Sequence, residues 1–382
     1  MKSNPMNEYP LLNESEGIPL FYPHVPKAAI TEVADTLAGR WIGQGPKVEK
    51  FEGMFQQAFL GMHSPLAVGS GTDALHLAYL LSDISFDDEV IVPVFTCTAT
   101  NLPLLYIGAK PIFADIDPLT MNLSIKDVER KITKKTKAIV CVDYGGVPNN
   151  YDLLNSLCQQ HGLKLISDAA HSIGSKYKDI YSGQLADFTI YSFQAIKTLT
   201  TGDGGLLAIK DESLLEKGKR LRWFGIDRVA KQGGIWENDI LEIGYKYQMN
   251  DIAASIGIAG MGEIHSVIQV RNELFKTYEK YLTSDRIQII GKSSTEEYFN
   301  SAWLITIIVD SNRVELMKKL RECGIESAQV HYRNDRYSVF GGRRTDLTNM
   351  DDLEERYLVL PLHLRMTQEH IIQICDVINA GW

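Results

Sequence analysis

The region from Pro65 to about Lys210 alternates short apolar runs with amphipathic segments, and this alternation constrains the fold more than any other feature of the chain. The apolar runs have the length of strands, whereas the segments between them have helical spacing. Strands that alternate with helices indicate an α/β domain with a mostly parallel sheet, whose ligands bind at the carboxyl ends of the strands. The expected strands are residues 65–68, 89–94, 110–115, 138–143, 163–168, 188–192 and 206–210.

Beyond residue 205 the pattern changes to longer helical segments with fewer strands between them. This change predicts two domains. The first is a large domain of residues 1–248, which includes an N-terminal lead-in, and the second is a smaller C-terminal α/β domain of residues 249–382. The helices expected outside the alternating region are residues 27–41, 212–222, one long helix over 251–283, 313–322 and 368–380.

Composition and charge exclude several classes of protein. The 382 residues are 45% hydrophobic and 23% charged, which is typical of a globular chain with a substantial core. The net charge of -9 argues against nucleic acid as a partner, because binding to a phosphate backbone depends on clustered Lys and Arg. No apolar run is long enough to cross a membrane, and we recognise no signal peptide. Five scattered cysteines without C-x-x-C spacing favour reduced thiols, no zinc site and a cytoplasmic location.

Lys197 lies shortly after the expected strand 188–192, in the segment Y-S-F-Q-A-I-K-T-L-T-T-G-D-G-G. An amine held at a strand end beside a bound ligand loses part of its hydration, which lowers its pKa and allows it to attack a carbonyl group. A solvated loop lysine is the more common explanation of any single lysine. The neighbouring motifs are needed to decide between these two explanations.

Asp168 ends an expected buried strand in the segment L-I-S-D-A-A-H. A carboxylate at this place would pair with a protonated pyridine nitrogen and keep the ring cationic, so that the ring withdraws electrons from a bound substrate. An N-cap or turn aspartate is the structural alternative. His171 would bind a phenolate oxygen of the same ring, and its alternative is a structural histidine with satisfied hydrogen bonds.

The segment A-V-G-S-G-T-D-A-L contains a strand, a glycine-punctuated turn and the start of a helix. Gly69 and Gly71 permit close approach of the backbone, while Ser70 and Thr72 supply hydroxyl groups. The free N–H groups of the helix N-terminus favour a phosphate at this place, and Ser192 would add another hydroxyl. Taken alone the motif is weak, because a plain N-cap turn explains it equally well.

Together these features describe a site for pyridoxal phosphate, and the sequence resembles the DegT/DnrJ/EryC1/StrS sugar aminotransferases over nearly its whole length. The resemblance implies a fold-type I architecture, with a large, mostly parallel mixed-sheet domain and a smaller C-terminal α/β domain. It rests on ordered motifs: W-I-G-Q-G-P at Trp41, G-S-G-T-D-A-L at Gly69, T-C-T-A-T at Thr96, D-A-A-H-S-I-G at Asp168, S-F-Q-A-I-K at Ser192, G-Y-K-Y-Q-M-N-D-I at Gly244 and L-P-L-H at Leu360.

The resemblance also implies a role for each matched residue. Lys197 matches the lysine that binds the cofactor covalently and later acts as general acid and base. Asp168 matches the partner of the pyridine nitrogen, and His171 matches a residue near the ring hydroxyl. The residues matched to phosphate contacts are Ser70, Gly71, Thr72 and Ser192.

Three positions depart from the family pattern. Cys97 stands where relatives commonly have an aromatic residue that stacks on the pyridine ring, so either Cys97 contacts the ring or Phe95 replaces the aromatic group. Lys246 stands where many relatives have an asparagine that reaches the active site of the neighbouring subunit of a homodimer. Lys246 would then contact a phosphate of the cofactor or of the substrate, unless it is a surface cation. Asp143 stands where relatives usually have a histidine.

The implied reaction is a transamination in two halves. L-glutamate would donate its amino group to the cofactor, and a keto sugar attached to a nucleoside diphosphate would accept it to become an amino sugar. Relatives that have histidine in place of Lys197 are dehydratases, so the lysine of this chain favours transamination. The alternatives are another fold-type I reaction, of the lyase or dehydratase type, or a non-catalytic regulatory relative.

The nucleotide, the sugar and the position of amination do not follow from the sequence. We take His331 and Arg228 as candidates for contact with the substrate. Arg222 and Arg333 offer the same chemistry. Exposed surface charge is the more common explanation for residues of this kind.

Overall fold

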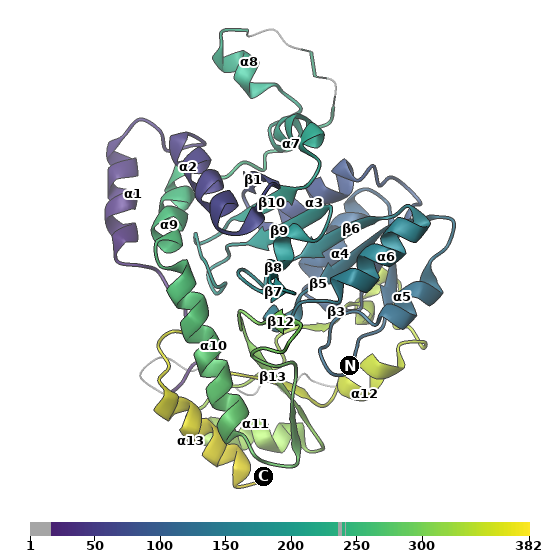
Figure 1. The fold of residues 1–382 in the computed structure, drawn as a ribbon, viewed down its shortest axis with the longest axis vertical. Coiled ribbons are helices and arrows are strands. Elements are labelled where there is room, and N and C mark those ends of the chain that lie inside the picture. Colours follow the sequence, from purple (N-terminus) through teal and green to yellow (C-terminus); the bar gives the residue numbers. More distant parts are fainter. Residues whose placement is uncertain (1–16, 236–238, 241) are drawn as a thin grey trace.

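The computed structural model describes residues 17–235, 239, 240 and 242–382 of the chain (Figure 1). Its centre is a seven-stranded sheet with the strand order β1-β10-β9-β6-β5-β2-β4. Strand β10 runs antiparallel to both β1 and β9, and the other neighbouring strands pair in parallel. The predicted large, mostly parallel mixed sheet is therefore confirmed. Its strands are β1 (Ser64–Val68), β2 (Glu89–Pro93), β4 (Lys110–Ala114), β5 (Thr136–Val142), β6 (Lys164–Asp168), β9 (Phe188–Ser192) and β10 (Gly205–Ile209).

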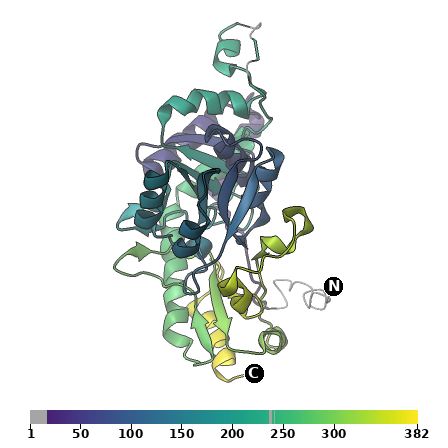
Figure 2. The same ribbon diagram turned by 90° about the vertical axis from the view of Figure 1, so that its right-hand side faces the viewer.

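Helices cover both faces of this sheet (Figure 2). Alternate residues of a strand point to opposite faces, so Val90 and Val92 of β2 share a core with one helical layer and Ile91 shares a core with the other. Both faces are apolar because both are covered. The helices of this part are α1 (Ala28–Ala38), α2 (Pro46–Phe55), α3 (Gly71–Leu81), α4 (Thr98–Tyr106), α5 (Ile125–Lys131), α6 (Tyr151–His161), α7 (Leu215–Arg222), α8 (Arg228–Gln232) and α9 (Asp251–Met261).

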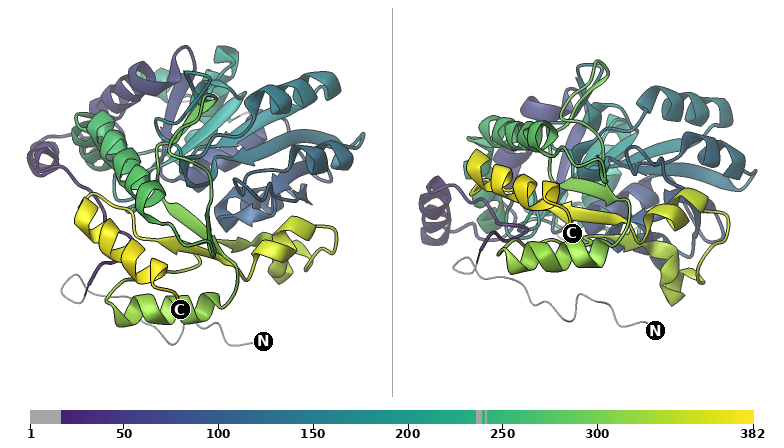
Figure 3. Two further views of the ribbon diagram at one scale, coloured as in Figure 1. Left: turned by 60° about the horizontal axis from the view of Figure 1, so that its bottom comes forward. Right: turned by 90° about the horizontal axis from the view of Figure 1, so that it is seen from below.

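The C-terminal part has a smaller antiparallel sheet with the order β11-β13-β15. Three helices pack on it through a separate hydrophobic core, which includes Phe275, Leu316 and Ile374 (Figure 3). The elements of this part are β11 (Ile287–Ile289), β13 (Ile305–Val309), β15 (Tyr357–Leu360), α10 (Ile264–Tyr281), α11 (Arg313–Glu322), α12 (Thr348–Leu353) and α13 (Gln368–Asn379).

The single long helix expected over residues 251–283 is wrong, because the chain forms α9 and α10 with a break at Gly262 and Glu263. Gly260 and Gly262 weaken the helix locally, since glycine is a poor helix former. A side chain at Gly260 would also place its Cβ only 2.4 Å from a methyl carbon of Leu199. The two helices serve different parts, because α9 packs on α1 and α2 whereas α10 packs on α13. The domain division after residue 248 stays a prediction.

Short strand pairs join distant segments around the large sheet. β3 (Phe95–Thr96) pairs with β14 (Tyr332–Arg333), and Tyr332 lies opposite Thr96 in this ladder. The pairing places His331 beside the segment that carries Cys97. β7 (Lys176–Tyr177) pairs with β8 (Ile180–Tyr181) and with β12 (Tyr298–Phe299).

The segment around α8 projects from the body beyond α7, at the top of the view in Figure 1. We call the described residues 224–235 of this segment the arm. Within the described residues, every helix is too short or too polar to cross a membrane.

Candidate active site

A hollow of about 470 Å³ opens where β6 and β9 end and α3 begins. This is the carboxyl edge of the parallel strands, where ligands of open α/β sheets bind. We call it the Lys197 hollow. Of the residues proposed from the sequence, those that line it are Ser70, Gly71, Thr72, Cys97, Asp168, His171, Ser192, Lys197 and His331.

Lys197 lies in the turn that follows β9, where its backbone N–H donates a hydrogen bond to the Gln194 carbonyl at 2.9 Å. Its Nζ lies 3.8 Å from the ring centroid of Trp303. Burial lowers the pKa of the Lys197 amine to about 8, although the nearby Cys97 and Asp168 favour its charged form. A large fraction of this amine is therefore neutral and nucleophilic slightly above neutral pH.

Asp168 is the last residue of β6 and is 5% exposed. One carboxylate oxygen accepts a hydrogen bond from the Thr100 hydroxyl at 2.7 Å, and the other accepts from the Ala170 N–H at 3.1 Å. Burial raises the pKa of the Asp168 carboxyl, while these hydrogen bonds and Lys197 oppose the rise. A buried carboxylate in this state is strongly stabilised by a cationic partner.

The N-terminus of α3 forms a cup at the edge of the hollow. Ser70 caps the helix, because its Oγ accepts a hydrogen bond from the Asp73 N–H at 3.1 Å. Gly71 lies so close to the end of β9 that a Cβ at this position would approach the Ser192 Cβ to 3.0 Å. The backbone N–H groups of the first helical turn and the Ser192 hydroxyl thus meet at one place, as an anion site requires.

Three aromatic side chains form a stack at the opposite side of the hollow. The His171 ring lies 3.9 Å from the Trp303 ring with an interplanar angle of 21°, and the His331 ring lies parallel to His171 at 5.2 Å. The two Nε2 atoms of the histidines are 3.4 Å apart. Burial lowers the pKa of both imidazoles, to about 3 for His331, so both rings are neutral at physiological pH.

Sequence reasoning missed Trp303 and Thr100. Trp303 is 1% exposed, and its indole N–H donates to the Ile196 carbonyl at 2.9 Å, one residue before Lys197. No local pattern singled out this tryptophan, because its partners lie far away in the sequence. The sequence does hold a signal for Thr100, because this residue closes the motif T-C-T-A-T that also contains Cys97.

Packing bears on two positions that the sequence left open. Phe95 is 1% exposed and packs edge-to-face against Tyr144 and Tyr357 in the core, so it does not replace the missing aromatic group. Cys97 lines the hollow. The Asp143 carboxylate is fully buried and accepts hydrogen bonds from neighbouring side chains, including the Asn149 amide at 2.8 Å, which is a structural role.

Lys246 and Arg228 lie outside the Lys197 hollow, at the base of the arm. The Lys246 ammonium lies 3.8 Å from the ring centroid of Trp223, and the guanidinium of Arg228 donates to the Gln44 carbonyl at 2.6 Å. This chain by itself therefore does not bring either residue to Lys197.

The expectation that Arg222 and Arg333 are surface charges is wrong. Arg222 is 5% exposed and pairs with Glu52 at 2.9 Å, while Arg333 is fully buried and pairs with Asp335 at 2.6 Å. A guanidinium can leave water in this way only when carboxylates and carbonyls replace its hydration. Both arginines hold the scaffold together.

The Lys197 hollow fits pyridoxal phosphate in three respects. At the cup, the helix N-terminus and the Ser192 hydroxyl come together because Gly71 has no side chain between them, and such a place favours a phosphate. The buried Asp168 carboxylate matches a cationic ring nitrogen, and the Lys197 amine matches an aldehyde carbon. The fold and the hollow therefore define a class, the lysine-dependent enzymes of pyridoxal phosphate.

Comparisons with known proteins agree with this class. The model of the DegT/DnrJ/EryC1/StrS aminotransferase family matches residues 23–379. An uncharacterised protein of Methanocaldococcus jannaschii, MJ1066, is 34% identical over 95% of this chain and 96% of its own length. GDP-perosamine synthase of Escherichia coli O157:H7 is 33% identical over 95% of this chain and 98% of its own length.

A solved structure shows the same architecture. The putative sugar aminotransferase Spr1654 of Streptococcus pneumoniae has a TM-score of 0.89 in both its PMP form and its PLP form. Its PMP form is 30% identical to this chain and is matched over 95% of this chain and 98% of its own length. The chain belongs to the DegT/DnrJ/EryC1/StrS aminotransferase family. It is thus an aminotransferase, and its cofactor is pyridoxal phosphate.

Proposed function

We propose that this aminotransferase transfers an amino group from L-glutamate to a keto sugar linked to a nucleoside diphosphate, and so produces an amino sugar. The observation that carries the chemistry is the buried Lys197 amine with a pKa of about 8, in one hollow with the buried Asp168 carboxylate. The sugar substrate is supported by the relatives, which include a GDP-perosamine synthase and a putative sugar aminotransferase.

Different residues of the hollow would bind different parts of the cofactor. Lys197 would hold the aldehyde carbon, and Asp168 would hold the ring nitrogen in its protonated form. The cofactor, when bound, carries the amino group and withdraws electrons from the substrate carbon. Cys97 would contact the ring face and His171 the ring hydroxyl. The phosphate contacts would come from Ser70, Gly71, Thr72 and Ser192.

Lys197 would also move the proton during transfer. Its low pKa lets it accept a proton from the donor carbon near neutral pH and return that proton at the neighbouring position. Trp303 lies against the Lys197 Nζ and limits the access of water to it. His331 also lines the hollow, and its imidazole is neutral. This ring would donate one hydrogen bond to the sugar or accept one from it.

We further propose a homodimer with shared active sites, in which Lys246 reaches the neighbouring subunit, and a cytoplasmic location. The position of Lys246 outside its own Lys197 hollow supports a contact made in the other subunit. The cysteines are free thiols, as a reducing compartment favours.

Absorbance of the purified holoprotein tests the proposal. Addition of L-glutamate should convert the absorbance of the lysine-bound cofactor to that of pyridoxamine phosphate, and a later addition of the correct keto sugar should reverse the change. A panel of keto sugars linked to dTDP, UDP and GDP identifies the acceptor. If glutamate changes nothing while another amino acid does, the donor is wrong. If no keto sugar restores the first spectrum, the acceptor is wrong.

A further inference from the structure

Trp303 makes two separate contacts with the segment that carries Lys197. Its indole N–H donates to the carbonyl of Ile196 at 2.9 Å, and its ring centroid lies 3.8 Å from the Lys197 Nζ. The first contact fixes the backbone next to the lysine, and the second places the amine at the aromatic ring. When the amine is protonated, the electron-rich face of an indole attracts it at this distance.

Trp303 is itself fixed by contacts with distant segments of the chain. Its backbone N–H donates to the Gly145 carbonyl at 3.0 Å, and its own carbonyl accepts a hydrogen bond from the buried Arg271 guanidinium at 3.1 Å. The rings of His171 and Phe21 are stacked on the indole, with centroids 3.9 Å and 5.7 Å from it. Because these partners lie on different elements, they hold the indole in one place relative to the large sheet.

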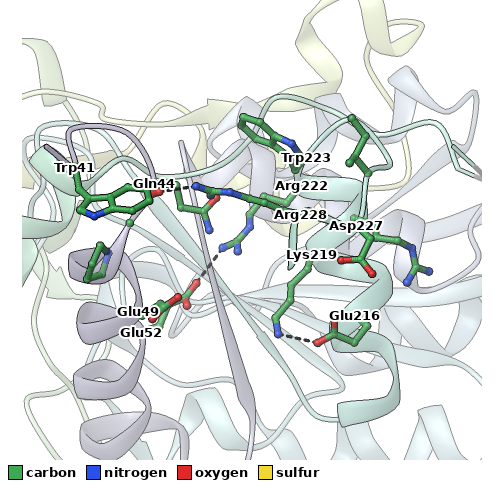
Figure 4. A pocket seen from close by; sticks show the side chains of 14 residues that line it. Trp41, Gln44, Glu49, Glu52, Glu216, Lys219, Arg222, Trp223, Asp227 and Arg228 are labelled. Atoms are coloured by element: carbon green, nitrogen blue, oxygen red, sulfur yellow. Dashed lines mark hydrogen bonds and ion pairs between the residues drawn. The ribbon is translucent and has the colours of Figure 1, made fainter. Parts of the chain in front are cut away.

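The chain contains a second contact between a lysine and an indole, and the two contacts differ in exposure. The Lys246 ammonium lies 3.8 Å from the ring centroid of Trp223, which is the same distance as at Trp303. Trp223 lines a separate hollow of about 650 Å³ at the base of the arm (Figure 4), and Lys246 is exposed to solvent. Trp303, in contrast, is 1% exposed. Water competes with an indole for an ammonium, so the contact at Trp303 is the stronger of the two.

Titratable side chains also face the Lys197 amine. In the described part of the chain they are Cys97, Asp168, His171 and His331. The first two favour the charged form of the amine. Both imidazoles are neutral, because burial lowers the pKa of each. An indole does not titrate in this range, so Trp303 favours the ammonium at every pH at which its neighbours change their charge.

We propose that Trp303 is a positioning residue of the transamination, which fixes the backbone before Lys197 and holds the amine at its ring while the amine carries a proton. During transfer, the lone pair of the amine takes the proton of the donor carbon, and the electron pair of the broken C–H bond is left on that carbon, from which the cofactor withdraws it. The ammonium then lies against the indole until it returns the proton at the neighbouring position. This role in transfer rests on the proposed function, whereas the contact between ammonium and indole in the apoprotein does not.

Tryptophan fluorescence of the full-length apoprotein tests this contact without a change at Trp303. Burial lowers the pKa of the Lys197 amine to about 8, so the emission should change as the pH passes through about 8. Lys197→Met removes the ammonium and should abolish the change. The same variant keeps Cys97, so a change caused by the thiol would persist in it. An emission that does not respond to pH in the unchanged protein, or that responds equally in Lys197→Met, overturns the proposal.

The capture of pyridoxal phosphate by the apoprotein, followed by stopped-flow absorbance across a range of pH, tests the aromatic face. Trp303→Phe keeps such a face and Trp303→Leu does not, while both variants lose the indole N–H. The ammonium is less stable without the face, so the midpoint of capture for Trp303→Leu should lie roughly one pH unit below that for Trp303→Phe. A leucine variant with a midpoint at or above that of the phenylalanine variant overturns the proposal.

Trp382 provides a matched control. Its indole N–H also donates to a backbone carbonyl, that of Ser311 at 3.3 Å, and the guanidinium of Arg286 lies 3.9 Å from its ring centroid. It does not line the Lys197 hollow. Trp382→Leu should therefore show the same change of fluorescence and the same midpoint of capture as the unchanged protein. A midpoint that moves as far in Trp382→Leu as in Trp303→Leu overturns the assignment to Trp303.

The glutamate half-reaction of the cofactor-loaded protein tests the role in transfer. Trp303→Leu should slow the conversion at saturating glutamate roughly tenfold, the scale of one lost contact, with little change in the glutamate concentration that gives half of the maximal rate. A variant that needs more glutamate but converts at the unchanged rate would show that Trp303 binds the substrate, and it would overturn the positioning role. If glutamate proves not to be the donor, the proposed function fails, while the fluorescence and capture results still decide whether Trp303 holds the amine.

Discussion

At the scale of single residues, the chemistry of the site depends on the surroundings of Lys197. A lysine in water has a pKa near 10.5 and is almost entirely charged at neutral pH, whereas burial brings this amine to about 8. The neutral form is the nucleophile, so its fraction increases as the pH rises through about 8.

We therefore expect the rate at which the apoprotein captures pyridoxal phosphate to rise with pH and to level off above about 8. Stopped-flow absorbance of the lysine-bound cofactor across this range gives the midpoint. Lys197→Arg should show no such absorbance at any pH. A midpoint near the ordinary lysine value would contradict the burial of the amine.

Asp168 and Thr100 form a second pair of residues that can be tested together. Asp168→Asn keeps the shape but cannot balance a cationic ring nitrogen, so the glutamate half-reaction should slow about 100-fold, as for the loss of one preorganised electrostatic contact. Thr100→Val removes a hydrogen bond to the carboxylate and should slow it about tenfold.

Both variants should still bind the cofactor at Lys197, and absorbance spectra check this. A Thr100→Val variant as slow as Asp168→Asn would mean that Thr100 touches the reacting groups itself. A Thr100→Val variant with unchanged rate would mean that the hydrogen bond does not hold Asp168 in place.

At the scale of elements, the N-terminus of α3 and the end of β9 are pressed together at Gly71 and Ser192. Gly71→Ala must move one of the two elements, so the affinity for pyridoxal phosphate should fall roughly tenfold, the effect of moderate overpacking. Fluorescence or absorbance titration of the apoprotein measures this affinity.

Gly53→Ala is the matched control, because Gly53 lies in α2 and a Cβ added there would meet no atom of another element within 4 Å. Alanine there should leave cofactor affinity unchanged and stabilise the helix by about 1 kcal/mol. Equal affinities of the two variants would show that the contact at Ser192 does not shape the cup.

At the scale of the whole molecule, apolar side chains in the arm and just after it are exposed in the single chain. Phe224, Ile240 and Ile243 are 43%, 55% and 84% exposed. Exposed apolar groups that cluster in this way favour an interface. We expect a second copy of the chain to cover them.

Light scattering should therefore give about twice the chain mass of 42.9 kDa. Ile243→Asp should shift the mass toward one chain and lower the activity, because Lys246 would no longer reach the neighbouring site. Val339→Asp alters a residue that is 57% exposed in the C-terminal part and should keep the dimer. An active monomer would show that the active sites are not shared.

Much of the fold and of the site follows from the sequence. The strands at residues 89–94 and 163–168 could be predicted because a strand buried on both faces must be apolar along its length. Lys197, Asp168 and Gly71 could be predicted because each follows a strand or begins a helix within a few residues. The break between α9 and α10 was missed, since Gly260 is required by contact with Leu199, about sixty residues away.

The sequence by itself determined the order of strands and helices and the residues at the strand ends, because these depend on local periodicity. Only the tertiary structure decided that Trp303 lies against Lys197, which comes 106 positions earlier in the chain. It also decided that Arg222 and Arg333 are buried. In the same way, it placed Arg228 beside Trp223. Burial and pKa depend on neighbours in space. Distant segments supply these neighbours, so no local pattern records them.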